Sequence, residues 1–342
     1  RTRIAILNHQ AGLKAKESAA FAPAYQLLRT GIDLIHQDSW QSLYDFTLAI
    51  HTDAAEVAYL AADHDEVERL GGIILKNARN LIGKVPFYVT RINSLTSLGR
   101  FKEALDTGLD TLDALDFKVP RKPTKRHVIL AFLRVETALR MTSLDSILKY
   151  PETKDPRLLA IFKLMDSMRV SSYISFMEMI AIFTFESICL LIKNKCLYRD
   201  GWFPFITYSE LFLIGIMGNI KRGDQLRKIA ELLADRLDAK LSESVIHFGR
   251  GCFALHRIDH LRTTFPSLMQ CYRVGLEYGN IEFASFGVAF LSMYMFMAGV
   301  ELQEIEKDFR TYTPLVARLK QERVLTAYQF FHQVVLNLRG LS

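Results

Sequence analysis

Apolar residues recur at intervals of three and four along much of the chain, which is the pattern of amphipathic helices. The clearest segment follows Leu98-Gly99 and has its apolar positions at Phe101, Ala104, Leu105, Leu109 and Leu112. Gly99 favours a tight turn before this helix, and Ala104 is small enough for a neighbouring helix to approach closely. A glycine turn followed by a small residue is typical of tetratricopeptide-type helix pairs, which recur about every 34 residues.

A second copy of this pattern lies upstream. A stripe over 43–59 ends at Ala62-Asp63-His64, and a further stripe covers 67–75. Aligning the two turns pairs Ala62 with Gly99 and Val67 with Ala104, at a spacing slightly longer than the about 34 residues of the repeat. Residues 3–35 predict one more pair, with a break near Gly12.

Prolines divide the rest of the chain. Pro120 and Pro123 end the first pattern, a helix pair is expected over 124–148, and the segment 150–156 is a rigid connector. Longer and more apolar helices are expected over 157–170, 172–194, 203–218, 223–239, 242–259, 265–278, 281–299 and 313–338. No segment alternates with a period of two. We therefore predict an all-α fold, an α-solenoid of antiparallel helix pairs. Residues 1–120 form tetratricopeptide-like repeats, 121–156 a helix pair with its proline-containing connector, and 157–342 a divergent array continuous with the first.

Two apolar runs have the length of membrane spans, over 173–192 and 283–300. Glu178 and Glu186 interrupt the first run, and the second contains Ser285, Gly287 and Ser292. Helices buried on two sides of a stacked array are apolar nearly all round, so we interpret both runs as buried helices and expect no membrane span.

Composition and charge narrow the class of protein. The chain has 342 residues, half of them apolar, and a net charge of +6. The four cysteines show neither metal spacing nor the framework of a small secreted domain, which indicates reduced thiols and a cytoplasmic protein. The chain starts within a helical pattern and has the character of a fragment of a longer polypeptide.

Candidate chemistry is sparse, and we predict no catalytic residue, no cofactor and no nucleic-acid partner. His256 and His260 stand one helical turn apart, but a zincin helix requires Glu where Arg257 stands, so polar or interface histidines are the favoured interpretation over a metal site. Gly83-Lys84 lacks the rest of a phosphate loop. A proline-broken basic run is better explained as a solvated loop than as a phosphate contact; its residues are Lys118, Arg121, Lys122, Lys125, Arg126 and His127.

The remaining candidates for function are the inward faces of the first helix of each pair. Such faces bind peptides or partner helices in a superhelical concavity, although they can also serve only to pack neighbouring helices. The residues expected there are Thr52, Glu56, Tyr59, Val89, Asn93 and Thr96.

The order of short motifs resembles one family along essentially the whole chain. It is similar to the helical-repeat region of large bacterial and fungal signalling proteins. In these, a serine/threonine-kinase-like domain and a STAND-type ATPase domain come first, and GAF and histidine-kinase or other output modules follow. The chain departs from the family at Ala62-Asp63 and Gly279-Asn280, where Gly-Asp is usual, and near His256, where Trp is frequent. The motifs lie at 7–8, 11–15, 18–21, 31–32, 40, 43–44, 48–51, 55–60, 120–124, 153–156, 275–284 and 333–340.

The resemblance implies a non-catalytic interaction and regulatory module. It would couple an ATPase/kinase region to a downstream output domain, by binding a protein or peptide partner or its own neighbouring domains. Two alternatives remain. One is a small-molecule or peptide sensor with a pocket in the apolar second half, around Tyr272, Phe286, Tyr294 and Phe296. The other is an all-α enzyme with a metal at His256 and His260.

Overall fold

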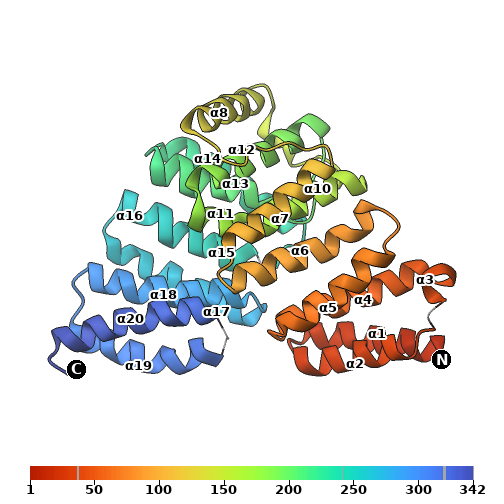
Figure 1. The fold of residues 1–342 in the computed structure, drawn as a ribbon. Coiled ribbons are helices and arrows are strands. Elements are labelled where there is room, and N and C mark those ends of the chain that lie inside the picture. The colour runs from red at the N-terminus through yellow and green to blue at the C-terminus, as the bar shows by residue number, and fades with distance from the viewer. Residues whose placement is uncertain (37, 241, 319–320, 342) are drawn as a thin grey trace. The chain divides into compact units, whose positions relative to one another are not determined.

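The structure, a computed structural model, describes residues 1–36, 38–240, 242–318 and 321–341 (Figure 1). Its regular elements within these residues are helices, and the β-type pairing found there is an isolated parallel bridge between Glu152 and Leu197. The all-α prediction is confirmed. The chain forms two compact units: unit 1 comprises residues 1–125 and 154–180, and unit 2 comprises residues 126–153 and 181–342.

Unit 1 is built from helices that pack against their neighbours in the sequence. α1 pairs with α2, α4 with α5, and α6 with α7, and α4 also packs against α2 and α6. The apolar stripes of these helices meet in a core that includes Leu28, Ile50 and Leu70. The helices are α1 (Thr2–Glu17), α2 (Phe21–Asp33), α3 (Ser39–Ser42), α4 (Tyr44–Leu60), α5 (His64–Asn77), α6 (Leu81–Ser97) and α7 (Phe101–Ala114).

The turns after α4 and α6 have the same backbone geometry. Ala62 and Gly99 both adopt the left-handed conformation, with φ of 61° and 75°. The Asp63 amide donates to the Ala58 carbonyl, and the Arg100 amide donates to the Leu95 carbonyl, each over 2.9 Å. This is the 6→1 bond of a Schellman cap. The predicted equivalence of Ala62 and Gly99 is confirmed, with Ala62 adopting a conformation that glycine reaches at lower cost.

Two helices from beyond the proline-rich connector complete unit 1. α10 (Pro156–Ser167) packs against α6 and α7, and α11 (Arg169–Ser175) packs against α7. Met168 lies between them and is fully buried in the space that the missing side chain of Gly108 leaves open. Unit 1 therefore includes α10 and α11, which follow the proline-containing connector in the sequence.

Unit 2 continues the pairing in two layers. The helical segments that begin at residues 203, 242, 281 and 322 pack against one another in that order, and the helices over 220–236, 265–277 and 302–318 pair with them. The elements are α8 (Lys125–Arg140), α9 (Leu144–Ile147), α12 (Met177–Asn194), α13 (Phe203–Thr207), η1 (Tyr208–Ile216), α14 (Ile220–Arg236), α15 (Ser242–Gly249), η2 (Arg250–Ala254), α16 (Leu255–Ile258), η3 (Leu261–Thr264), α17 (Phe265–Glu277), α18 (Ile281–Met297), α19 (Leu302–Arg318) and α20 (Glu322–Leu338).

Some predicted helix boundaries were wrong. α1 continues through Gly12 without a break. Leu28 of α2 packs where a side chain at Gly12 would stand, so this glycine permits a close helix crossing and does not form a turn. The single helix expected over 313–338 is two helices, α19 and α20, and Pro314 lies inside the first of them.

Neither of the two long apolar runs forms one uninterrupted helix over its whole length. Phe176 adopts an extended conformation, with φ of −150° and ψ of 99°, and separates α11 from α12. α18 ends at Met297, before the end of the second run. None of the described helices is long and apolar enough to cross a membrane.

Candidate functional site

α4, which carries three of the predicted binding residues, packs against α6. Thr52, Glu56 and Tyr59 are all half-buried. The Thr52 hydroxyl donates to the carbonyl of Leu48 over 3.0 Å, and the Glu56 carboxylate pairs with Lys16 of α1 over 2.6 Å. Glu56 thus offers a carboxylate on the surface of unit 1 that an existing cation already attracts.

The predicted residues of α6 divide into two groups. Val89 and Asn93 are half-buried, whereas Thr96 is 9% exposed. The Thr96 hydroxyl donates to the Ile92 carbonyl and shares a 2.7 Å hydrogen bond with the Ser171 hydroxyl of α11. A partner reaches Thr96 only if α11 moves. The helix contact between α4 and α6 brings the other five residues onto adjoining helices.

Replacing Thr96 by valine is expected to lower the free energy of unfolding by about 1–3 kcal/mol, because the buried Ser171 hydroxyl loses its partner. Thr311→Val is the control, since its exposed hydroxyl also donates to the carbonyl four residues earlier. Urea denaturation of both variants measures the difference. Equal stabilities of the two variants would contradict the role of Thr96 in packing.

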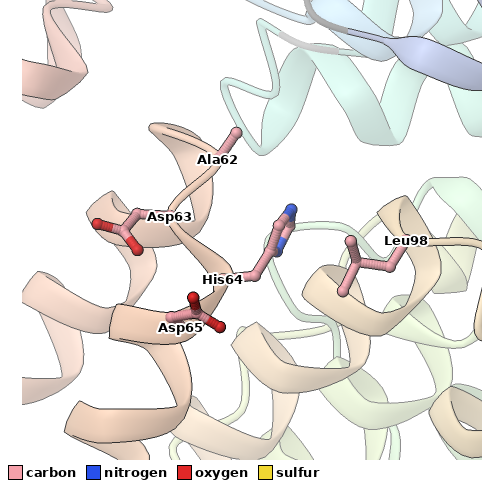
Figure 2. Close-up of a pocket in the computed structure, with 5 residues that line it drawn as sticks. All are labelled: Ala62, Asp63, His64, Asp65 and Leu98. Atoms are coloured by element: carbon pink, nitrogen blue, oxygen red, sulfur yellow. The ribbon is translucent and has the colours of Figure 1, made fainter.

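A shallow depression of about 590 Å³ lies beside the α4–α5 turn (Figure 2). Its wall consists of Ala62, Asp63, His64, Asp65 and Leu98, so it joins the two equivalent turns of unit 1. The His64 Nδ1 lies 2.7 Å from the Ser94 hydroxyl, which fixes the imidazole against α6. The depression presents one imidazole and two carboxylates to solvent. The sequence pattern predicts only a turn at Ala62-Asp63-His64 and does not indicate this depression.

The aromatic residues expected to enclose a ligand in the second half pack against other side chains. Tyr272 contacts the Tyr312 ring edge to face at 5.5 Å, and Phe286 contacts Phe248 at 5.7 Å. The Tyr294 hydroxyl donates to the Cys252 carbonyl over 2.8 Å. Phe296 packs on the core around Tyr272, so these residues contribute to the interior of unit 2.

The two histidines proposed as metal ligands do not share a helical face. α16 ends at Ile258, and Asp259 is extended, with φ of −146° and ψ of −178°. His260 instead accepts a hydrogen bond from the Arg262 amide at the start of η3, while His256 lies against the Tyr294 ring. The one-turn spacing assumed for the pair is therefore wrong, because the helix breaks between them. The described residues hold no group of three or more His, Cys, Asp or Glu placed to share a metal ion.

The cysteines are free thiols in the structure. Burial raises the pKa of Cys189 to about 11 and the pKa of both Cys252 and Cys271 to about 12. The thiolate is the reactive form, so these environments disfavour nucleophilic chemistry at neutral pH.

The most unusual group of unit 2 is the carboxyl of Glu210, in a place that the sequence prediction passed over. Two π-helical segments pack against each other: η1 continues α13 to the end of its helical stretch, and η2 lies between α15 and α16. π-Helical turns are uncommon and often lie at functional positions. Glu210 lies in η1, is 1% exposed, and neither of its carboxyl oxygens accepts a hydrogen bond within the described structure.

The positive charges around Glu210 only partly offset the energetic cost of burying its carboxylate. The nearest cation is Arg227 of α14, whose Nε lies 3.9 Å away and whose other nitrogens pair with Asp224 and Glu231. Burial raises the pKa of Glu210 to about 7, and attraction to Arg227 and Arg250 opposes that rise. This carboxyl therefore changes its charge near neutral pH. A single acidic residue within the apolar run 208–216 is the sequence signal that marks it.

A cavity of about 450 Å³ opens between α14, α15 and the end of α17, next to Arg250 at the start of η2. Glu231 and Arg250 line it, and both act electrostatically on Glu210. Its wall also carries His247, whose pKa is lowered by burial although Glu243 lies 3.9 Å away. The cavity wall therefore carries ionisable groups of both signs.

Comparison with known proteins adds no relative to this description. No protein-family model matches the chain, and no curated protein matches it.

Proposed function

We propose that the chain is a non-catalytic interaction and regulatory module of a multidomain signalling protein. It binds a protein or peptide segment on the adjoining faces of α4 and α6. The observation that carries the proposal is the contact between these two helices, the first members of successive pairs. Helix pairs stacked in this way form extended surfaces for peptides and partner helices.

The chemistry of this face favours a partner with a cationic or amide-bearing segment. Glu56 supplies a carboxylate, Asn93 an amide, and Tyr59 a half-buried aromatic surface. Aromatic residues surrounded by polar groups are common at the centres of interfaces. The family resemblance supports a partner within the same polypeptide, namely the kinase-like or STAND-type ATPase domain, and a coupling role toward an output domain.

The test is binding of the purified 342-residue chain to the kinase-like and ATPase domains of its own gene product, measured by isothermal titration calorimetry. We expect a 1:1 complex that Glu56→Ala and Asn93→Ala each weaken about tenfold, or about 1.4 kcal/mol. Asp106→Ala is the matched control, since it removes an exposed carboxylate from α7, the second helix of a pair. A gene product without such domains contradicts the coupling role, and full affinity of both face variants contradicts the assigned surface.

A further inference from the structure

One face of α8 holds this helix onto unit 2. Ala131, Val135 and Leu139 are buried on that face. The Phe132 ring meets Phe185 of α12 edge to face at 6.0 Å, and the Glu136 carboxylate accepts a 2.6 Å hydrogen bond from the Tyr208 hydroxyl. These contacts fix which side of α8 is turned outward.

The outward face is apolar. Ile129, Leu130 and Leu133 are 57%, 60% and 54% exposed, and Met141, directly after the helix, is 83% exposed. Single exposed apolar residues are ordinary on protein surfaces, but a contiguous group of large ones marks an interaction site.

Cations border this apolar face. Arg126, Arg134 and Arg140 are exposed, and no exposed residue from 125 to 141, a stretch that the structure describes throughout, is Asp or Glu. Arg134 pairs with the half-buried Glu186 and Arg140 lies 3.7 Å from Glu136, yet both arginine side chains stay more than half exposed. Lys125, the first residue of the helix, is also exposed and adds to this positive charge.

We propose that α8 is an interfacial helix that binds the surface of membranes rich in anionic lipids. Apolar side chains flanked by Lys and Arg are the composition of helices that lie in the plane of a bilayer surface, with the apolar residues among the upper acyl chains. The neighbouring cations add attraction to anionic headgroups.

The attachment of α8 favours a flat surface over a groove in a partner protein. A helix bound in a groove buries most of its circumference, and α8 has already buried the Ala131–Val135–Leu139 side within its own unit. It therefore offers half a cylinder, which a lipid surface can cover completely.

Co-sedimentation of the full chain with sucrose-loaded vesicles tests this proposal. We expect binding to phosphatidylcholine vesicles that contain about 30% phosphatidylserine, little binding to phosphatidylcholine alone, and a loss of binding as salt is raised. Lys125→Gln combined with Arg126→Gln should lower the partition coefficient about 25-fold, since each cation near the surface contributes about fivefold.

The apolar contribution has its own variant. Ile129→Ser, Leu130→Ser and Leu133→Ser together should abolish binding, whereas the control Leu232→Ser, an exposed apolar residue on α14, should not change it. Lys102→Gln with Lys221→Gln is the control for charge, and circular dichroism verifies that every variant keeps the native helix content. Equal binding to both vesicle types, full binding by the α8 variants, or binding only to an acidic protein or a nucleic acid would each overturn the proposal.

Discussion

Replacement of Glu210 by glutamine is expected to stabilise the protein in a pH-dependent manner. Relative to the wild type, the free energy of unfolding of Glu210→Gln should rise by roughly 2–3 kcal/mol between pH 5 and pH 8. Burial raises the pKa of this carboxyl to about 7, above the value of 4.5 that it has when solvated in the unfolded chain. The folded state therefore holds its proton more tightly than the unfolded state does.

The sign follows from this difference. As the pH rises from 4.5 toward 7, the unfolded carboxyl releases its proton first, so the wild type loses stability over that interval. Above pH 7 the folded protein keeps a buried charge whose nearest cation, Arg227, is shared with Asp224 and Glu231. Glutamine carries no charge at any pH. Its side chain finds no hydrogen-bond partner at this site among the described residues, as is also true of the protonated Glu210 carboxyl.

Urea denaturation at pH 5, 6, 7 and 8 measures the effect, with Glu306→Gln as the matched control. Glu306 is also buried, but its carboxylate accepts hydrogen bonds from Arg310 and, over 3.0 Å, from Arg339. Its replacement leaves these arginines without their anion and should destabilise the protein at pH 8 by about 1–3 kcal/mol. If wild type and Glu210→Gln change in parallel with pH, the carboxyl does not titrate in the interior.

The sequence predicted what local patterns determine. The apolar spacing of residues 101–112 and the two turns at Ala62 and Gly99 were sufficient to predict α7 and the pairing of α4 with α5 and of α6 with α7. The π-helical segments η1 and η2 were not predicted, because a π-turn changes the apolar spacing by a single residue. Glu210 lies in η1, so the apolar periodicity of an α-helix could not indicate its burial.

The sequence pattern also did not predict which helices from distant segments pack against each other. Pro151 and Pro156 mark a connector, but they do not indicate that Met168 fills the space at Gly108 or that α10 and α11 pack against α7. Likewise Thr96 shares the helical face of Asn93 by spacing, and its partner Ser171 lies in a helix far along the chain. Local periodicity assigns a residue to a face of its own helix, whereas the partner of that face is a property of the whole array.

Gly71 and Gly72 illustrate this difference within one helix. They are neighbours in α5, yet the space beside Gly71 is filled and the space beside Gly72 is open. A Cβ at Gly71 would lie inside the Phe87 ring of α6, whereas a Cβ at Gly72 would meet no atom within 4 Å. Phe87 is 1% exposed and belongs to the core, so it has little space to retreat.

Gly71→Ala is therefore expected to destabilise the protein by about 1–3 kcal/mol through overpacking, and Gly72→Ala to stabilise it by about 0.5–1 kcal/mol. The two variants add the same methyl group to the same helix, so helix propensity and the unfolded state contribute equally to both. Their difference in denaturation midpoint, at unchanged m-value, isolates the contact between α5 and α6.

A double-mutant cycle identifies Phe87 as the side chain responsible. Phe87→Leu removes ring atoms from the volume that the new methyl enters, so it should cost less in the Gly71→Ala background than in the wild type. Additive effects would mean that the methyl group meets a different obstacle, and equal stabilities of Gly71→Ala and Gly72→Ala would contradict the close approach of the two helices. Because this contact joins the second helix of one pair to the first helix of the next, its loss would also loosen the α4–α6 face on which the proposed partner binds.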